Sequence, residues 1–250
     1  MSEIVLPTSR SKPEVKNPKN LIIFSKPKTG KTSLIAALDK CLLLDLEDGS
    51  DYVSAMKMKA KSIKDLKLIG KAIKEAGNPY KFVAIDTITA LEEMCIPYAE
   101  QLYSQSPMGK NWFTEGKGKS KYGNILGLPD GAGYYWLRIA FTKVIDYIMT
   151  WAPHTILLGH VKDTMLEKDG INVSIKELDL TGKLKRITTS NSDAIAYLYR
   201  KGNQNILSFK TADDVSCGAR PEHLENAEIV ISEINEKGEY VTHWDKVFID

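Results

Sequence analysis

The chain has 250 residues, of which 43% are hydrophobic and 26% are charged, an ordinary mixture for a globular protein with one good-sized core. Its formal net charge of +2 excludes a polyanion partner held by the overall field of the molecule, so such a partner would need a local basic region. Membrane-spanning runs, a signal-peptide pattern and C-x-x-C spacings are lacking in the sequence, and we therefore expect a reduced, cytoplasmic protein that does not bind membranes.

Short apolar runs of strand length alternate with segments of helical spacing over the first two thirds of the chain. Residues 1–19 are rich in Pro, Lys and Ser and predict an extended arm, whereas residues 20–250 predict a single domain. The predicted strands are 20–25, 41–47, 81–87 and 154–162, and the predicted helices are 31–40, 62–77, 89–103 and 134–152. This alternation predicts an α/β fold with a mainly parallel central sheet flanked by helices.

The last third of the chain changes character. Residues 193–250 read as two hairpins, one around "GNQN" and the other around "EKGE", which we expect to add antiparallel strands to the C-terminal end of the same sheet. Residues 104–133, between two predicted helices, break all periodicity with Gly, Ser and Lys. A connector of this length in a compact domain is usually functional or disordered.

A phosphate-binding pattern lies at the first strand-to-helix junction. Residues 25–32, "SKPKTGKT", fit G-x-x-x-x-G-K-[ST] at every fixed position except the first, where Ser25 replaces glycine. Backbone N–H groups of such a loop curl around an anion, and the start of the helix adds partial positive charge. We expect Lys31 to reach the terminal phosphates of ATP. The predicted nucleotide-binding residues are Ser25, Lys26, Pro27, Lys28, Thr29, Gly30, Lys31, Thr32 and Ser33.

Carboxylates end two of the neighbouring predicted strands. Asp86 follows four apolar residues in "FVAID", where it would complete a Mg²⁺ site with the Thr32 hydroxyl, although it would also suit the cap of the next helix. Asp45 and Glu47 end "CLLLDLE" and would point the same way while the strand lasts. Either a group that activates water or a solvated acidic turn is consistent with this pair.

Four segments in this order resemble the core of the RecA-like recombinases: "LIIFSKPKTGKTSL", "LLLDLEDGSDYV", "FVAIDTITAL" and "HTILLGHVKD". The resemblance covers residues 20–210, and the short chain and the "DLEDG" element look most like the phage-encoded members that act in single-strand annealing. It implies that Lys31 and Thr32 bind phosphate and Mg²⁺, that Glu47 activates water and that Asp86 completes the metal shell. His160 stands where the bacterial recombinase has a glutamine that senses the terminal phosphate, or it is a hydrogen-bonded core histidine.

The resemblance also implies head-to-tail assembly, as a ring or a filament, with a basic residue of the neighbour on the terminal phosphate. Lys210 and Arg220 are candidates for this contact in trans, and arginine is the better clamp for phosphoryl oxygens. Either residue is equally consistent with an ordinary surface charge. The N-terminal "EIVLP" suits an edge strand that docks on the next subunit.

In RecA-like proteins two loops after the core strands hold single-stranded DNA. Residues 104–133 interleave lysines, which neutralise backbone phosphates, with aromatic rings, which stack on bases. A surface lid without a DNA role would have a similar composition. The DNA-binding candidates are Lys110, Trp112, Phe113, Lys117, Lys119, Lys121 and Tyr122 in the first loop, with Lys183, Lys185 and Arg186 in the second segment.

These features predict a Mg²⁺-dependent ATPase that binds single-stranded DNA and promotes annealing or homologous recombination, phage-encoded and active in the host cytoplasm. Its expected partners are DNA, further copies of the chain and a single-stranded-DNA-binding protein. Two alternatives share the P-loop. A nucleotide or small-molecule kinase commonly needs an arginine-rich lid, and residues 104–133 contain no arginine. An assembly protein would use ATP between subunits with little turnover.

Overall fold

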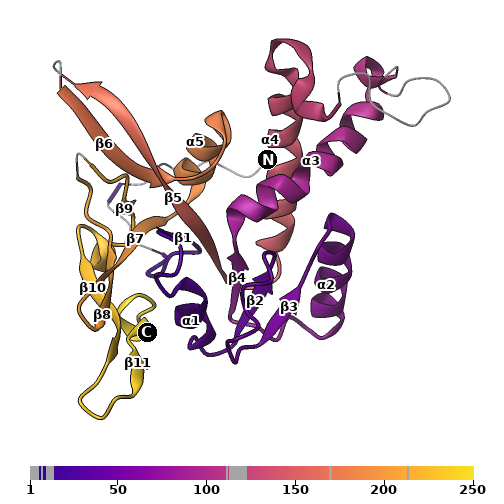
Figure 1. Ribbon diagram of the computed structural model, residues 1–250. Coiled ribbons are helices and arrows are strands. Elements are labelled where there is room, and N and C mark those ends of the chain that lie inside the picture. The colour runs from indigo at the N-terminus through magenta and orange to yellow at the C-terminus, as the bar shows by residue number, and fades with distance from the viewer. Residues whose placement is uncertain are drawn as a thin grey trace.

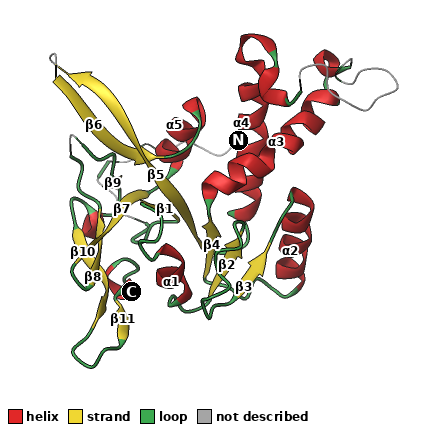
Figure 2. Ribbon diagram, viewed as in Figure 1, coloured by secondary structure: helices red, strands yellow, loops and turns green. Residues whose placement is uncertain are grey.

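The computed structural model describes residues 6, 8–9, 14–110, 112, 123–168, 171–212 and 214–250. Within these ranges the strands form one sheet in the order β11-β10-β8-β7-β1-β5-β4-β2-β3, with β6 paired to β5 and β9 paired to β7 (Figure 1). Helices and strands alternate along the first half of the chain, as Figure 2 shows. No helix in the described ranges is long and apolar enough to cross a membrane.

The elements follow the predicted order closely. The strands of the parallel part are β1 (Asn20–Ser25), β2 (Cys41–Asp45), β3 (Lys57–Lys59), β4 (Phe82–Asp86) and β5 (His154–Lys168). The helices are α1 (Lys31–Ala36), α2 (Ile63–Glu75), α3 (Ile88–Ser104), α4 (Ala132–Ile148) and α5 (Gly182–Asn191). The remaining strands are β6 (Ile171–Leu178), β7 (Ala194–Lys201), β8 (Gln204–Ser208), β9 (Gly218–Ala219), β10 (Glu228–Ile234) and β11 (Tyr240–Thr242).

The predicted change from parallel to antiparallel pairing is confirmed. β1 pairs in parallel with both β5 and β7, and β2 and β4 continue the parallel set. β8 and β10 then pair antiparallel to their neighbours, and β11 closes this side of the sheet. Both predicted C-terminal hairpins therefore exist and belong to the main sheet. The division of the chain into an arm and a single domain stays a prediction.

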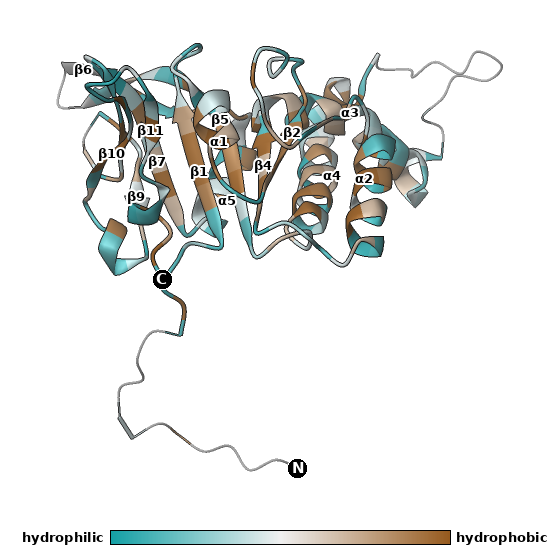
Figure 3. Cartoon of the chain, turned by 90° about the horizontal axis from the view of Figure 1, so that it is seen from below, coloured by the Kyte–Doolittle hydropathy of each residue, from teal (hydrophilic) through white to brown (hydrophobic). Residues whose placement is uncertain are grey.

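The central strands send alternate side chains into two separate apolar layers, because side chains of a strand point to opposite faces in turn. In β1, Ile22 and Phe24 join the layer formed with α2, α3 and α4, whereas Leu21 and Ile23 join the layer formed with α1 and the C-terminal segment. Figure 3 shows the hydrophobic central strands between these layers.

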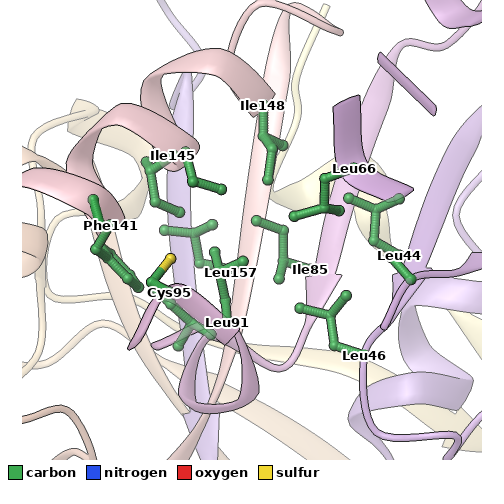
Figure 4. Close-up of a cluster of buried hydrophobic side chains, with 14 of the residues drawn as sticks. Leu44, Leu46, Leu66, Ile85, Leu91, Cys95, Phe141, Ile145, Ile148 and Leu157 are labelled. Carbon is green, nitrogen blue, oxygen red and sulfur yellow. The ribbon is translucent and has the colours of Figure 1, made fainter. Parts of the chain in front are cut away.

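The layer under α3 and α4 is the larger one. Leu157 of β5 and Ile85 of β4 meet Leu91 and Cys95 of α3 in this layer, and Ile148 of α4 lies nearby (Figure 4). All five side chains are almost fully buried. Burial also raises the pKa of the Cys95 thiol to about 12, so this cysteine is an apolar packing residue.

Helix α2 shows how local signals set the ends of an element. The Ser62 hydroxyl accepts a hydrogen bond from the Asp65 amide and caps the first turn. Gly77 ends the helix at a positive φ of 76°, as its position in the sequence predicts. Between these ends, Leu66, Ile69 and Ile73 face the core.

Several features differ from the sequence prediction. Helix α1 ends at Ala36 rather than near residue 40. Strand β5 continues to Lys168, well beyond the sheet, and forms a projecting antiparallel hairpin with β6 (Figure 1). Helix α5 was not predicted, because its segment carries mostly Lys, Arg and Thr and shows little apolar periodicity.

Candidate functional site

The carboxyl ends of four parallel strands meet at one edge of the sheet. β1 ends at Ser25, β2 at Asp45 and β4 at Asp86, while β5 carries His160 in register with Ser25. Ligands of open α/β sheets bind at this edge. A cleft of about 490 Å³ lies here, large enough for a small-molecule ligand. It is lined by Pro27, Lys28, Gly30, Lys31, Thr32, Ser33, Asp45, Glu47, Gly49, Val53, Asp86, Thr87 and His160.

The predicted phosphate loop runs from β1 to α1. Gly30 caps α1 with a φ of 102°, a backbone conformation that favours glycine, and its carbonyl accepts the hydrogen bond from the Leu34 amide. Ser25 still belongs to the extended strand, so the first position of the motif needs no glycine here. Its hydroxyl accepts a bond from Lys31 Nζ at 3.0 Å. The mismatch at Ser25 is therefore compatible with the loop.

Lys31 lies at the centre of the loop and is only 6% exposed. Burial lowers the pKa of its ammonium, and the carboxylates of Asp86 and Glu47 oppose this shift. Its hydrogen bonds go to two neutral oxygens, the Ser25 hydroxyl and, at 3.4 Å, the Lys26 carbonyl. A buried cation with neutral partners is strongly favoured by an added anion, so the loop is suited to phosphate.

Thr32 and Asp86 form the second part of the site. Thr32 Oγ1 donates to Asp86 Oδ2 at 2.6 Å. Burial raises the pKa of Asp86, the hydrogen bond from Thr32 and the charge of Lys31 oppose this shift, and the carboxylates of Glu47 and Asp45 raise the pKa further. The side chain that caps α3 is Thr87, which accepts from the Ala90 amide, so Asp86 does not serve as the helix cap.

The donor set fits Mg²⁺ that arrives with a nucleotide. Within the described ranges, no group of three or more His, Cys, Asp or Glu side chains is arranged to hold a metal by itself. Mg²⁺ is usually bound through one or two carboxylates together with substrate phosphates and waters. The Thr32 hydroxyl and the buried Asp86 carboxylate supply hard oxygen ligands of this kind, and a bound cation would offset the cost of burying Asp86.

Glu47 lies in the loop after β2, beside the phosphate loop. Its Oε1 accepts from Thr87 Oγ1 at 2.5 Å and lies 3.4 Å from His160 Nε2. The other ring nitrogen of His160, Nδ1, is buried without a hydrogen-bond partner in the described structure. The predicted catalytic residues Glu47, Lys31 and His160 are thus brought together, and Thr87, which the sequence analysis did not single out, orients Glu47.

Asp45 has a different task from Glu47. β2 ends at Asp45, so the two side chains do not share one strand as the alternation predicted. Asp45 Oδ1 accepts from the Glu47 and Gly49 amides, and Oδ2 accepts from the Ser50 amide at 3.0 Å. Burial alone would raise the pKa of Asp45, but the bonds from Ser50 and from the backbone amides outweigh burial and lower it. Asp45 therefore holds the loop that presents Glu47.

Comparison with known proteins decides the family. A family model described as AAA domain matches residues 17–220. The chain belongs to the AAA-domain family. With the phosphate loop at the strand-to-helix junction, this membership makes it a nucleotide-binding P-loop ATPase.

Two further comparisons add little to this assignment. The search among curated proteins returned no match. The solved structure of a KaiC-like protein from the hyperthermophilic archaeon Pyrococcus horikoshii OT3 aligns over 90% of this chain and 89% of its own, with 12% identity and a TM-score of 0.45. The assignment rests on the family match and on the geometry of the loop.

The two basic candidates for a trans contact lie away from the phosphate loop of this AAA-domain protein. β8 runs antiparallel to β7, so the segment after β8, with Lys210, lies at the opposite edge of the sheet. Lys210 Nζ bonds to Glu228 at 2.6 Å. Arg220 bonds to Asp193 at 3.0 Å and to the Ser190 carbonyl at 2.8 Å, also at that edge. Neither residue is placed to contact the loop of its own chain.

One DNA-binding prediction is wrong. Trp112 is 2% exposed and packs edge-to-face on Tyr103 with a ring separation of 5.2 Å, as part of the core under α3 and α4. An indole inside the core cannot stack on a base. Lys110 is exposed. The other candidates of the first loop lie outside the described residues: Phe113, Lys117, Lys119, Lys121 and Tyr122.

The second basic segment is helix α5. Lys183 and Arg186 are exposed on this helix. Lys185 instead pairs with Glu177 of β6, which also accepts a hydrogen bond from Thr164 of β5 at 2.7 Å. Lys185 thus ties α5 to the projecting hairpin and is less available than its neighbours for a phosphate contact.

A second cleft, of about 480 Å³, lies between the first turns of α4 and α5. Tyr134 and Tyr135 on the α4 side are 40% and 53% exposed. The guanidinium of Arg138 lies 5.8 Å from the centre of the Tyr135 ring, and Lys183 lines the α5 side. We call these four residues the tyrosine cleft. In the sequence, Tyr134 and Tyr135 are predicted only as helix residues, although the i,i+4 spacing of Tyr134 and Arg138 is a signal for a shared face.

Proposed function

We propose that this AAA-domain protein is a RecA-like, Mg²⁺-dependent ATPase that binds single-stranded DNA and promotes strand annealing or homologous recombination. The observation that carries the proposal is the tyrosine cleft, where exposed aromatic rings and cationic side chains line one hollow beside the phosphate edge. Lys31 and the loop amides would hold the phosphates, Thr32 and Asp86 would hold Mg²⁺, and Glu47 would activate water.

The tyrosine cleft suits single-stranded nucleic acid. Aromatic faces stack on unpaired bases with little sequence preference, while Arg138 and Lys183 would neutralise backbone phosphates. In a duplex the bases already stack on one another, so the two tyrosines would have no free face to meet. This chemistry favours a single strand over a double strand.

Chain topology supports placing the cleft and the phosphate loop on the same side of the sheet. Helix α4 ends just before β5 begins, so its first turn, with Tyr134 and Tyr135, lies toward the edge where the parallel strands end. Helix α5 likewise precedes β7, which is parallel to β1, so its first turn lies toward that edge as well. A DNA strand in the cleft would therefore run near the nucleotide.

A chain of hydrogen bonds supports coupling between the two sites. The His160 carbonyl, beside Glu47, accepts from the Asp179 amide at 2.9 Å. The Asp179 carbonyl accepts from Thr89 in the first turn of α3. Glu92, one turn further along α3, accepts from the Thr181 amide at 3.1 Å, at the start of α5. A movement of His160 on binding ATP would therefore displace residues 179–181 and, with them, Lys183 at the start of α5.

Assembly is part of the proposal. Lys210 and Arg220 lie at the edge opposite the loop, which is where a head-to-tail neighbour would need them for a contact in trans. Closing that contact would require each residue to leave its present carboxylate partner. We further propose that the protein is phage-encoded and acts with a single-stranded-DNA-binding protein in the host cytoplasm.

The deciding experiment is the rate of phosphate release with and without a single-stranded oligonucleotide. We expect the single strand to raise the rate, and a duplex of the same sequence to do so much less. Nucleotide-kinase activity would instead show as phosphate transfer to an acceptor with no effect of DNA. An unchanged rate with single-stranded DNA, together with a DNA affinity that does not depend on salt, would overturn the DNA part of the proposal.

Glu47→Gln separates a motor-like ATPase from a protein that uses ATP only between subunits. The amide keeps the shape of Glu47 but cannot accept a proton, so turnover should fall by roughly 10²- to 10⁴-fold. ATP and DNA binding should persist. If the variant assembles and works as the parent does, ATP acts only as a structural ligand.

A further inference from the structure

Three polar side chains form a row across neighbouring strands beside the phosphate loop. Arg200 of β7 faces Asn205 of β8 in register, and Asn205 faces Ser232 of β10. Arg200 Nε donates to Asn205 Oδ1 at 3.2 Å, and Asn205 Nδ2 donates to Ser232 Oγ at 2.9 Å. Asn205 is 4% exposed and Ser232 is fully buried, so the row runs from the interior of the sheet to an exposed guanidinium.

The exposed end of the row reaches the phosphate loop. A Cβ atom placed on Gly30 would lie 3.6 Å from Asn205 Nδ2 and 3.9 Å from Arg200 Nη2. Gly30 is the residue at which the loop turns into α1, and its side without a side chain is therefore the side that Arg200 and Asn205 face. The Arg200 guanidinium therefore lies beside the phosphate loop, on the side of the loop that faces β7.

Nothing in the described structure uses the free end of this arginine. Its Nε is held by Asn205, and among the described residues no carboxylate lies within ion-pairing distance of its Nη groups. The other arginines of known surroundings differ: Arg220 is paired with Asp193, and Arg138 lies over Tyr135. Because Asn205 and Ser232 are buried and hydrogen-bonded, they fix the position of the Arg200 guanidinium while its Nη groups stay available for a ligand.

We propose that Arg200 is a phosphate contact for the nucleotide of its own chain, with Asn205 as its positioning residue. Arginine presents planar N–H donors that match the oxygens of a phosphate, and fixing Nε pre-organises the other two nitrogens. The loop backbone around Gly30 cradles the α- and β-phosphates, whereas Lys31 reaches toward the γ-phosphate. Arg200 therefore binds a phosphate that ADP retains. This inference needs only the nucleotide site and holds whether or not the protein binds DNA.

The test is ATP and ADP binding by Arg200→Ala, without DNA. We expect both affinities to fall together by about 10- to 100-fold, the loss of charge-assisted hydrogen bonds, with the turnover of bound ATP nearly unchanged. Arg200→Lys keeps the charge without the fork and should recover only part of the loss. Lys201→Ala is the matched control, because Lys201 is the next residue of β7 and its side chain alternates to the other face.

Asn205→Ala tests the positioning role. It should lower both nucleotide affinities by less than Arg200→Ala, and it should add little to the loss when combined with Arg200→Ala, which a purely structural role would not predict. Two results would overturn the proposal. One is unchanged affinity in Arg200→Ala while Lys31→Ala loses binding. The other is a loss confined to ATP with a fall in turnover, which would place Arg200 on the transferred phosphate.

Discussion

The nucleotide edge and the tyrosine cleft lie on the same side of the sheet but are built in opposite ways. At the nucleotide edge the functional groups hold one another and several of them are buried, as in the pairs Lys31 with Ser25 and Thr32 with Asp86. In the tyrosine cleft, Tyr134 and Tyr135 stand exposed on the first turn of a helix whose other face fills the core.

This difference separates stability from binding. Removing Lys31 or Thr32 leaves a buried polar partner, Ser25 or Asp86, unsatisfied, so such changes affect the fold as well as the ligand. Removing a side chain from the cleft exposes no core, and its effect should appear in DNA affinity alone. Four substitutions test this contrast.

Trp112→Ala should destabilise the protein by about 3–5 kcal/mol, the usual cost of emptying a buried indole site. Urea unfolding measures this loss. Trp112→Phe keeps most of the apolar contact with Tyr103 and should fold well enough for DNA titration, with the affinity of the parent. A Phe variant that keeps its stability but loses DNA binding would show that Trp112 contacts DNA, contrary to its position in the core.

Asp45→Asn should cost about 1–3 kcal/mol at pH 7, because the new amide cannot accept the bonds that Ser50 donates to Oδ2. The pKa of Asp45 lies below its ordinary value in the folded protein. Its carboxylate therefore stabilises the fold above the unfolded pKa of about 3.9, and this contribution is lost as the pH falls through the folded pKa. The free energies of unfolding of parent and variant should converge as the pH falls into the acid range. A difference that stays constant with pH would contradict a stabilising role of the ionised Asp45 carboxylate.

Tyr135→Ala should weaken binding of a single-stranded oligonucleotide by about 1–3 kcal/mol, the value of one stacked base. Thermal unfolding should stay at the parent temperature, since the ring is 53% exposed. Tyr240→Ala, which removes a comparably exposed ring from β11, is the matched control and should bind DNA normally. Equal losses in the two variants would show that the cleft is not a specific site.

Lys183→Ala should have the smallest effect. Removing one phosphate contact lowers the slope of log affinity against log salt by about 0.7 for a single strand, with no change in sequence preference. Lys237→Ala, in the turn between β10 and β11, removes the same charge away from the cleft and should leave the slope unchanged. An unchanged slope in Lys183→Ala would remove α5 from the proposed interface.

Local sequence patterns were enough to predict most of the nucleotide edge. The loop at Lys31 and the acidic ends of β2 and β4 depend on neighbours a few residues apart and on the shared edge of parallel strands. The turn at "GNQN" and the stop at Gly77 are likewise short-range signals. Glu47 was placed correctly beside this edge, but the end of β2 was not, and so the role of Asp45 in holding the loop at Glu47 was missed.

What could not be predicted depends on contacts between distant segments. Trp112 reads as a surface aromatic among lysines, and only the packing of α3 against α4 provides the space that buries it. The row from Arg200 to Ser232 joins three strands whose register follows from two turns and an irregularity near Val230. Tyr134 and Tyr135 belong to a helix that was predicted, but the cleft that they line also needs α5, which was not.

The side chains of β1 alternate between two apolar layers, and this alternation also fixes the position of the phosphate loop at the end of the strand. A slip of one residue would exchange Leu21 and Ile23 with Ile22 and Phe24 between the layers. It would also carry Ser25 and the turn at Gly30 about 3.3 Å along the strand. The free-energy cost of misplacing these four apolar side chains is thus also a cost of misplacing the phosphate loop. Apolar side chains that touch no ligand therefore fix the position of the nucleotide-binding loop.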